Sequence, residues 1–540
     1  MGGRNSQQPC GLGDSLSKGL RHGIRRGGAL TGPLSTSPFW FTRRDFLRGA
    51  GASLAAMALW LAGCSPETTE AFLTLLEKIA NRPVRREVSS LAWDDPILVS
   101  YRTAIAAMKA LDSANPLNWN NIADIHRYNC PHGNWLFLPW HRAYLYYFER
   151  ICRHLSGNAD FALPYWNWQD NPALPAAFAD PTLPDGQPNP LYLPGRSLSP
   201  PPDVPSSVRS GTVMESILRE SNFEIFGSQR LPSGSTNQRS QVGSGPLEAT
   251  PHNSIHGWVG GDMRLVAFSP RDPIFWLHHN MVECVWVEWE LGRRFDNPDS
   301  PEWRDWVFDE FVDETGSSVT VTPAEMALYP LIAYRYERTS KGADLAASAF
   351  DLETEAGAED AQAHLQEGGE TSVELIDVVE PAVDVRALEV AVDGPALVEF
   401  ALTVGDLVNE YRQSGANRLM ISISVQPPEV TNQSLLLWVN QPEPQVDARG
   451  AEGDPRFVGA LSTFGRGLDD TFLCDLEPSP VRFALNVAGL LIALSNSEPD
   501  EQLIFTMGIA PAVEDISSVA PLTIDILELQ FLQVVDPDRG

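Results

Sequence analysis

The histidines of this chain are concentrated in two short segments, and this distribution constrains the fold more than any other feature of the sequence. Most of the ten histidines lie within residues 124–150 and 251–280, beside tryptophans and apolar residues at helical spacing. A lone histidine is usually a hydrogen-bonded member of the core, but two clusters indicate that the fold gathers imidazoles around a metal. The clustered residues are His126, His132, His141, His252, His256, His278 and His279.

Spacing within the second segment predicts how its side chains are presented. His252 and His256 are four residues apart, so they project from one face of a helix as a two-ligand unit. The pattern is similar to the HExxH motif of zinc proteases, but Asn253 stands where the general-base glutamate would be. The segment therefore argues against a metalloprotease.

The end of the second segment predicts another helix, which starts at Asp272–Pro273. His278 and His279 are adjacent on it, about 100° apart around the helix axis. Only one of the two can therefore reach the metal bound by the preceding pair. Both lie in apolar stripes, so the periodicity does not choose between them.

The first segment predicts an irregular chain between two of its histidines. His132 and His141 are nine residues apart, about 900° of helix, so on one continuous helix they would face opposite ways. Pro139 in the first turn of a helix provides the break. We therefore expect His132 on a loop and His141 on a helix.

Two upstream helices are predicted from Asn or Asp followed by Pro. Asp95–Pro96 is typical of an N-cap and first helical residue, and opens a helix over 95–111. Asn115–Pro116 predicts the start of a second helix, which carries His126 on its apolar face. The N-terminal half of the chain is thus predicted to be mainly helical.

The donor set favours copper. Imidazole ligands without carboxylates suit copper better than calcium or magnesium, and the set differs from the thiolate-rich sites of structural zinc. Helical proteins build such centres from side chains on facing helices. Four scattered cysteines outside the leader cannot hold the fold together by disulfides, which agrees with a cofactor protein.

Composition excludes some function classes. The formal net charge is −31, and a chain this acidic repels phosphate backbones, so nucleic acid is not an expected partner. The 43% hydrophobic content is that of a globular protein with a sizeable core. The length of 540 residues suggests about two to four domains.

The pattern of the sequence changes in the C-terminal part. Residues 343–385 are acidic and poor in aromatic residues, which predicts a linker. After residue 386, short apolar runs alternate with a period of two and are separated by Pro, Gly and Asn. We therefore expect an all-β sandwich over residues 386–540.

The first 64 residues are predicted to be a leader. Arg43–Arg44 precedes an apolar run over 49–63 that is too short to cross a bilayer and is typical of an export signal of the twin-arginine type. The run ends in a lipobox-like sequence at Cys64, which predicts lipidation there; the alternative is a plain signal peptide. We expect a periplasmic or cell-surface protein, anchored to the membrane where Cys64 is lipidated.

Four motifs together identify a resemblance. They are HGNWLFLPWHRAYLYYFE (132–149), FALPYWNW (161–168), HNSIHGWVGG (252–261) and RDPIFWLHHN (271–280). The chain resembles type 3 dicopper proteins of the tyrosinase and polyphenol oxidase family, in a bacterial form with a C-terminal shielding domain like that of plant polyphenol oxidases. The resemblance implies a four-helix-bundle dicopper domain over residues 65–342 and a jelly-roll-like sandwich.

The resemblance also implies the ligands of two copper ions. One copper would be held by His126, His132 and His141. The other would be held by His252, His256 and His279, because the family uses the second histidine of the pair.

Further residues take roles from the resemblance. Cys130 is expected to form a thioether with His132; the alternative is a free buried thiol. Glu248 matches the family's water-holding acid and Asn253 its partner, although a helix-terminal charge and a capping residue would explain them too. In the β domain, Leu461 or Phe464 is the candidate for an apolar side chain that enters the pocket, or else belongs to the sandwich core.

The implied function is the oxidation of phenols by O₂. It comprises ortho-hydroxylation of monophenols and oxidation of o-diphenols to o-quinones, in a latent proenzyme that cleavage in the acidic linker would activate. One alternative is an oxidase for catechols or o-aminophenols without activity on monophenols. A second alternative is a protein that binds oxygen or copper without turnover.

Overall fold

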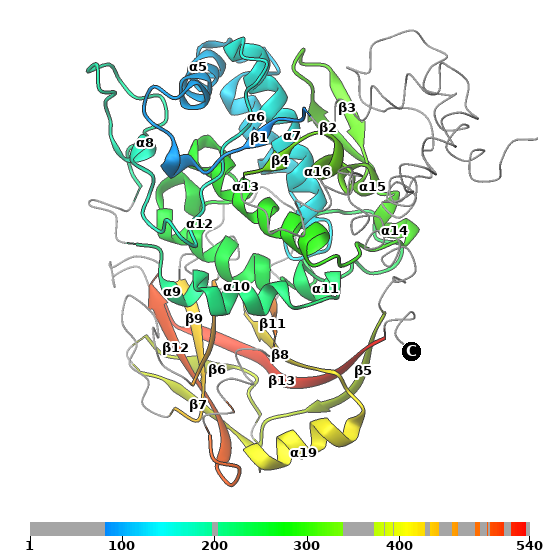
Figure 1. Ribbon diagram of the computed structural model, residues 1–540. Helices are drawn as coiled ribbons and strands as arrows, with labels where there is room; N and C mark the ends of the chain where they lie inside the picture. Colours follow the sequence, from blue (N-terminus) through cyan, green and yellow to red (C-terminus); the bar gives the residue numbers. More distant parts are fainter. Residues whose placement is uncertain are drawn as a thin grey trace, which may run out of the picture.

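A helical domain is followed along the chain by a β domain in the computed structural model (Figure 1). The structure describes residues 81–196 and 203–337, and in the C-terminal part 372–382, 384–392, 394–426, 433–441, 456–462, 481–486, 494, 497–511 and 520–535. The predicted leader with Cys64, most of the predicted linker, and Phe464 lie outside these residues.

The helical domain contains three long helices with short ones around them. The long helices are α5 (Pro96–Ala110), α7 (Phe137–Ser156) and α13 (Ile274–Val287). The other helices are α6 (Trp119–Asn129), α8 (Ala176–Ala179), α9 (Ser206–Arg209), α10 (Gly211–Leu218), α11 (Phe223–Phe226), α12 (Asn253–Val259), α14 (Pro301–Arg304), α15 (Pro323–Met326) and α16 (Tyr329–Ile332). Short 3₁₀ or π turns are η1 (Val88–Ser90), η2 (Glu248–His252), η3 (Gly261–Arg264), η4 (Ser269–Arg271) and η5 (Glu288–Gly292).

Two of the three predicted helix starts are confirmed by their caps. The carboxylate of Asp95 accepts a hydrogen bond from the backbone nitrogen of Ile97 at 2.9 Å, at the start of α5. Asp272 accepts one from Ile274 at 3.0 Å, at the start of α13. Each cap satisfies a donor that the first helical turn leaves unpaired.

The predicted start of the next helix at Asn115–Pro116 is wrong by one turn. Asn115 does form a local cap, because its side chain accepts from the backbone of Leu117 at 2.9 Å. The helix α6 begins only at Trp119, where Asn118 is the N-cap and also donates to the carbonyl of Leu111 at 2.7 Å. The contact with the end of α5 anchors the second cap in the fold.

Aromatic packing joins α7 to α13 in the centre of the helical domain. Phe148 of α7 stacks on Trp276 of α13, with ring centroids 3.5 Å apart and planes 10° apart. Tyr144, one turn earlier on α7, contacts the same indole with centroids 4.5 Å apart. Every residue of α13 is buried, which explains why periodicity alone could not orient its two histidines.

Two small sheets complete the helical domain. In the first, β1 (Val84–Arg85) pairs in parallel with β4 (Arg335–Tyr336), so the beginning and the end of the domain lie side by side. In the second, β2 (Phe308–Val312) pairs antiparallel with β3 (Ser318–Val321). Phe311 of β2 packs against Trp140 of α7, with centroids 5.2 Å apart.

The β domain consists of two antiparallel sheets. One has the order β10-β9-β12-β7, and the other the order β11-β8-β13-β5, with β6 also paired to β13. The strands are β5 (Ser372–Val379), β6 (Leu388–Val390), β7 (Ala396–Thr403), β8 (Arg418–Val425), β9 (Gln433–Val439), β10 (Phe457–Ser462), β11 (Val481–Asn486), β12 (Gln502–Pro511) and β13 (Leu522–Val535), and helix α19 (Val404–Ser414) follows β7. Apolar residues of both sheets form one cluster between them.

Strand β5 corrects the predicted linker boundary. It lies inside 343–385, yet it pairs with β13, so the β domain starts at least 14 residues before the expected residue 386. The acidic residues Glu374 and Asp377 caused the misinterpretation, because charge on an edge strand resembles the composition of a linker.

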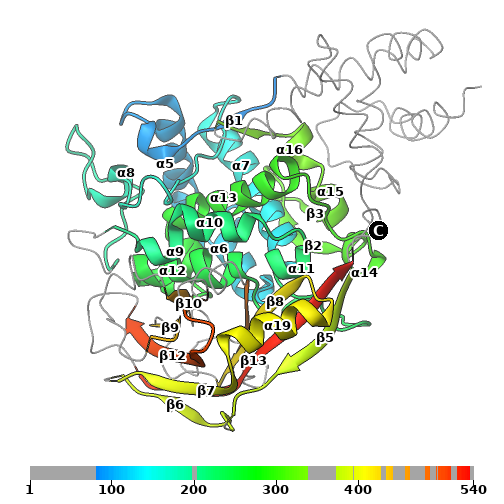
Figure 2. The ribbon, with the colours of Figure 1, turned by 60° about the horizontal axis from the view of Figure 1, so that its bottom comes forward.

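The β domain docks on the helical domain through both of its sheets (Figures 1 and 2). On one side, β10 packs against η2 and α12, and Leu436 and Trp438 of β9 belong to the helical domain's apolar core. On the other side, Arg418 of β8 pairs with the buried Glu220 at 3.1 Å. Burial raises the pKa of Glu220, and Arg418 opposes this shift.

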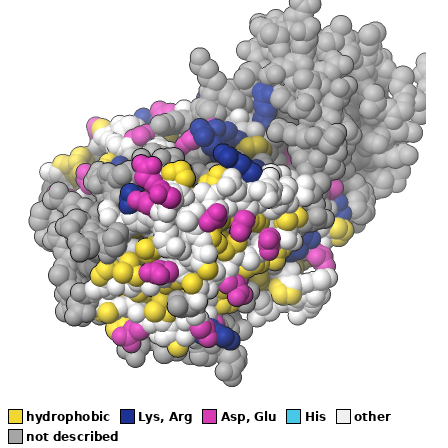
Figure 3. Space-filling view, turned by 90° about the horizontal axis from the view of Figure 1, so that it is seen from below, with side chains coloured by type: hydrophobic (Ala, Val, Ile, Leu, Met, Phe, Trp, Pro, Cys, Tyr) yellow, Lys and Arg dark blue, Asp and Glu magenta, His cyan; other side chains and the backbone are white. Residues whose placement is uncertain are grey.

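The face of the molecule formed by the β domain carries dispersed acidic side chains among apolar and polar ones (Figure 3). Among the described residues, no helix combines the length and apolarity needed to cross a bilayer.

Candidate metal centre

Three histidines of the first segment meet in the core of the helical domain. His126 comes from the last turn of α6, and His141 from the start of the second turn of α7. His132 lies between the two helices on an irregular stretch, as the position of Pro139 predicted. The ring centroids of the three are 5.3 to 5.4 Å apart, and all three side chains are buried.

Three histidines of the second segment meet beside them. His252 closes the π turn η2 and His256 lies on α12, so the pair spans a junction of two helix types. Their Nε2 atoms lie 3.3 and 3.0 Å from Nε2 of His279 on α13. Three nitrogen atoms therefore point at one place.

The two groups of histidines adjoin each other. The rings of His141 and His279 are stacked, with centroids 4.4 Å apart and planes 13° apart. His132 and His252 are also neighbours, with centroids 5.7 Å apart. The site therefore has two adjacent sets of three imidazoles, which we call the first triad (His126, His132, His141) and the second triad (His252, His256, His279).

Backbone and side-chain acceptors orient several of these rings. Nδ1 of His141 bonds the carbonyl of Phe137, and Nδ1 of His256 that of Met263, both at 2.8 Å. Nδ1 of His252 bonds Oδ1 of Asn253 at 2.8 Å. An acceptor at Nδ1 keeps the proton there and leaves Nε2 as the ligand atom, as in metal sites generally.

Burial keeps at least four of the six imidazoles neutral. It lowers the pKa of His141 to about 3, although the hydrogen bond to Phe137 opposes the shift. Burial also lowers the pKa values of His126, His256 and His279 well below the usual value, and neighbouring histidines add to the effect. Neutral imidazole is the form that binds a metal.

The residues fit a metal pair. At least one ring nitrogen of His126, and Nε2 of His141, are buried and have no hydrogen-bond partner among the described residues. Buried polar atoms without a partner are costly, and a bound cation would satisfy them. An all-nitrogen donor set of this kind suits copper.

His278 is a second neighbour of the second triad. Its ring is fully buried, and nitrogen atoms of His252, His256 and His278 also lie within 4.8 Å of one another. We assign His279 to the triad because its Nε2 approaches both other Nε2 atoms, whereas His278 is stacked beside His252 with centroids 5.5 Å apart. The structure thus offers a geometric reason for a choice that periodicity left open.

Cys130 lies beside the first triad. It is the C-cap of α6 and is buried, and its Sγ is 3.5 Å from Nδ1 of His132. The sulfur therefore lies close to the imidazole with which a thioether is expected.

Glu248 connects the two triads. Its fully buried carboxylate accepts hydrogen bonds from the backbone nitrogen of Gly133 at 2.8 and 2.9 Å and from the hydroxyl of Ser228. Gly133 follows a ligand of the first triad, and Glu248 begins the turn that ends in His252. Sequence reasoning missed Ser228, since it lies in a polar loop segment with no motif around it.

The β domain approaches the second triad through β10. Leu461 of this strand is fully buried, in a cluster that holds the sandwich core and also Ala249, the neighbour of Glu248. Its entry into a pocket stays a prediction. The other candidate, Phe464, lies outside the described residues.

Two adjacent triads of buried imidazoles, held by helices and by the stretch between α6 and α7, with a β domain docked on them, define an all-histidine dinuclear metal protein. The family model described as the common central domain of tyrosinase matches residues 105–201 and 202–291, which include all six histidines of the two triads. Residues 105–291 therefore match the common central domain of tyrosinase, and the cofactor of the chain is a pair of copper ions.

Known proteins resemble the chain over different lengths. It is 30% identical over 301 residues to polyphenol oxidase A1, chloroplastic, of Vicia faba, which covers 48% of both chains. It is 29% identical over 290 residues to tyrosinase HcTyr1 of Hahella sp. (strain CCB-MM4), covering 45% of this chain and 61% of the relative. The chain spans about half the length of the first of these relatives.

A solved structure supports the domain order. Latent apple tyrosinase aligns with a TM-score of 0.56 at 20% identity, covering 84% of this chain and 97% of the apple protein. At this identity the likeness concerns the fold, which combines a helical core with a β-rich C-terminal domain.

Proposed function

We propose that this protein oxidises phenols with O₂ at its copper pair, by ortho-hydroxylation of monophenols and oxidation of o-diphenols to o-quinones. The observation that carries the proposal is the convergence of six buried imidazoles in two adjacent triads. The family of the central domain supports it. We extend the proposal to the fold, with α6, α7, α12 and α13 as a four-helix bundle and the two sheets as a jelly roll.

In this proposal, each triad holds one copper ion. Bound copper supplies the exchange of electrons between O₂ and the phenol. The chain's own residues keep the site dry and hold the ligand rings in place. Phe275 packs on the ring of His279, with centroids 4.1 Å apart, and Phe137 packs on the ring of His141 at 4.8 Å.

Glu248 and Asn253 are the proposed residues for removing the phenol's proton. Nδ2 of Asn253 is buried and has no hydrogen-bond partner among the described residues, so it is available to a water molecule. The Glu248 carboxylate lies in the same region, beside Gly133, and would accept the proton through that water. Asn253 would therefore serve both the proton path and the orientation of His252.

The test compares a monophenol with the corresponding catechol. We expect the copper-loaded chain to form quinone from both after proteolytic nicking between residues 343 and 371. Glu248→Gln should lower kcat/KM for the monophenol by about 10²- to 10⁴-fold, the usual contribution of a general base, and affect the catechol much less. The activity assay with both substrates checks this split, and Ser240→Ala, which alters a partly buried residue outside the two triads, is the matched control.

Other outcomes of this assay point to other functions. Quinone from the catechol alone would replace the proposal by a narrower oxidase for catechols or o-aminophenols. Absence of quinone from both substrates, with two coppers bound and O₂ taken up reversibly, would replace it by an oxygen-binding protein. A chain that binds copper but not O₂ would be a copper-binding protein.

We propose that the β domain makes the chain latent. Its support is the packing of β10 against η2 and α12, which carry His252 and His256. Leu461 or Phe464 is the proposed plug. Quinone formation that is equally fast before nicking and after nicking followed by dilution would contradict latency but not phenol oxidation.

We propose a thioether between Cys130 and His132, supported by the 3.5 Å separation of sulfur and ring nitrogen. Formation joins sulfur to a ring carbon and releases two hydrogen atoms to an oxidant, for which O₂ at the copper pair would serve. After copper loading in air, mass spectrometry of the peptide that contains both residues should show a mass lower by two hydrogens and no thiol that alkylates. An alkylated Cys130 in fully copper-loaded protein would contradict the bond.

Export by the twin-arginine route and lipidation at Cys64 are further proposals. They are supported by the sequence of the leader alone, which lies outside the described residues.

A further inference from the structure

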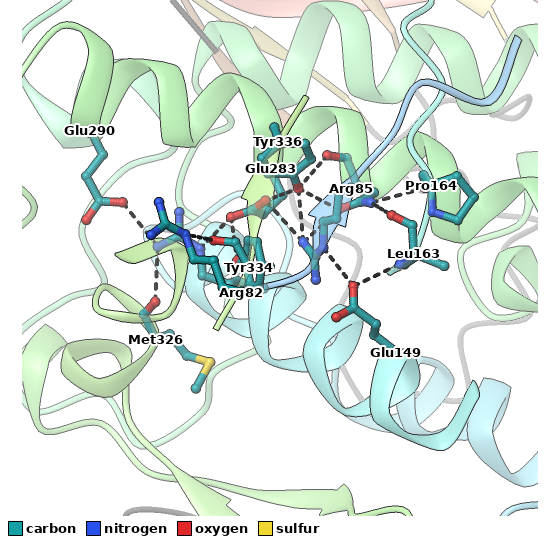
Figure 4. A network of polar contacts seen from close by, with 12 residues as sticks. Arg82, Arg85, Glu149, Leu163, Pro164, Glu283, Glu290, Met326, Tyr334 and Tyr336 are labelled. Atoms are coloured by element: carbon teal, nitrogen blue, oxygen red, sulfur yellow. Dashed lines mark hydrogen bonds and ion pairs between the residues drawn. The ribbon is translucent and has the colours of Figure 1, made fainter. Parts of the chain in front are cut away.

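A network of buried ionic groups lies between α7 and α13, on the side of these helices opposite the β domain (Figure 4). Fully buried charges are rare and costly unless each one is paired. Such a network in the centre of a domain therefore calls for a specific role. The ionisable members, all at most 3% exposed, are Arg85, Arg142, Glu149, Glu283 and Glu290.

The first link in this network joins the two helices directly. Arg142 of α7 donates from Nε to Oε1 of Glu283 on α13 at 2.9 Å. Its guanidinium group lies over the ring of Trp286, 3.3 Å from the centroid, and also donates to Glu290. Arg142 follows His141 in the sequence, and Glu283 lies one helical turn after His279.

The second link runs through strand β1. Arg85 donates from Nε to Glu149 of α7 and from Nη1 to Oδ1 of Asn280 on α13, both at 2.8 Å. Asn280 follows His279, and its own amide donates to the carbonyl of Leu163 at 2.8 Å. Arg85 thus connects the same two helices as Arg142, but at a different position along their axes.

Charge and geometry make these links directional. A guanidinium group presents its donors in a rigid plane, so two helices joined through it have a defined spacing and register. Burial alone would raise the pKa of Glu149, but Arg85 and Arg153 lower it, so the carboxylate stays ionised.

The two links affect the spacing of the two ligands at which the triads meet. His141 of the first triad and His279 of the second have stacked rings with centroids 4.4 Å apart. A shift of α7 against α13 changes this separation directly. No other described residue of the first triad shares a helix with the network, so the effect acts through His141 and His279.

We propose that Arg85, Arg142, Glu149, Glu283 and Asn280 form a clamp that fixes the separation of the two copper sites. They are positioning residues, since they act through the ligands that stand beside them in α7 and α13. The proposal rests on the copper pair assigned above. It predicts that the clamp controls how the two coppers interact, as distinct from whether the chain folds.

The test uses Cu(II) bound to the full chain and electron paramagnetic resonance. Two Cu(II) ions close enough to share a bridging ligand couple and give no ordinary signal, whereas separated ions do. We expect most of the Cu(II) bound to the parent protein to give no resonance signal. Glu283→Gln should raise several-fold the fraction of bound copper that gives an electron paramagnetic resonance signal. It should also lower the affinity for the second copper ion by about 10- to 100-fold, as the loss of a residue that supports a ligand does in other metal sites.

Two further variants keep the result decisive. Arg142→Lys retains the charge but not the planar donor group, so it should produce the same change in milder form and serves if Glu283→Gln does not fold. Glu220→Gln is the matched control, because it removes a buried carboxylate that is paired with an arginine but lies at the domain interface. Circular dichroism and thermal unfolding monitor the fold of each variant.

The outcomes separate the clamp from the copper assignment. The clamp would be overturned if folded Glu283→Gln and Arg142→Lys keep the parent's copper affinity and its fraction of copper that gives a resonance signal. An equal rise in Glu220→Gln would also overturn it, by showing a general effect of lost ion pairs. A parent chain that binds fewer than two coppers would overturn the assignment on which the proposal rests.

Discussion

His279→Asn should lower the copper content of the protein from two ions per chain to one and abolish quinone formation. The reason is that Nε2 of His279 lies 3.0 Å from that of His256 and 3.3 Å from that of His252, so its loss removes one of three converging donors. Metal analysis of the purified, copper-loaded variant measures the effect. Because the first triad takes all its ligands from α6, α7 and the stretch between them, its copper should remain.

The neighbouring variant His278→Asn is the matched control. It changes the same residue type at the adjacent position of the same helix, with equal burial. We expect two coppers per chain and an affinity reduced by at most about 10- to 100-fold, as for residues around a ligand. One copper in His278→Asn and two in His279→Asn would reverse the assignment and place the other histidine in the second triad.

Trp276→Ala should destabilise the helical domain by about 3–5 kcal/mol, the usual cost of truncating a large buried aromatic residue. The indole is fully buried, is stacked on Phe148 of α7, and donates to the carbonyl of Pro270 at 3.2 Å. Its removal leaves a cavity between the two helices that carry His141 and His279. Thermal and denaturant unfolding of the copper-free protein measure the loss.

A surface apolar residue provides the comparison for this variant. Val307 is 54% exposed, so Val307→Ala should change the free energy of unfolding by at most about 0.5 kcal/mol. A loss below about 1 kcal/mol in Trp276→Ala would mean that the core around α7 and α13 relaxes into the space of the indole.

Much of the metal centre was predictable because its signals are local. The spacing of His252 and His256 and the helix start at Asp272 follow from helix geometry and capping alone. The choice of His279 over His278 needed the fold, since both rings are buried and only tertiary packing determines which nitrogen faces the other two histidines.

The misplaced boundaries have a common physical cause. Asn115 and Asn118 both cap the next turn, and only the contact of Asn118 with Leu111 distinguishes the true helix start. Likewise, β5 is a strand because β13, some 150 residues later, pairs with it. Long-range pairing of this kind leaves no trace in a local pattern.

The sequence also contains an indication of the buried clamp. Arg142 and Glu283 are charged residues within apolar stripes of helices, next to or one turn from a ligand. Charges in such positions are seldom left unpaired. Their pairing with each other could have been suggested from the sequence, but the participation of Arg85 from β1 could not.

The pairing of β1 with β4 brings the start and the end of the helical domain together, and the chain continues from this end toward the β domain through one covalent connection. While that covalent connection is intact, docking of the β domain is an intramolecular event with a fixed effective concentration. Once it is cut, docking becomes bimolecular and the two parts separate on dilution. Release of a nicked chain should therefore follow protein concentration, and a nicked but concentrated sample should behave like the uncut one.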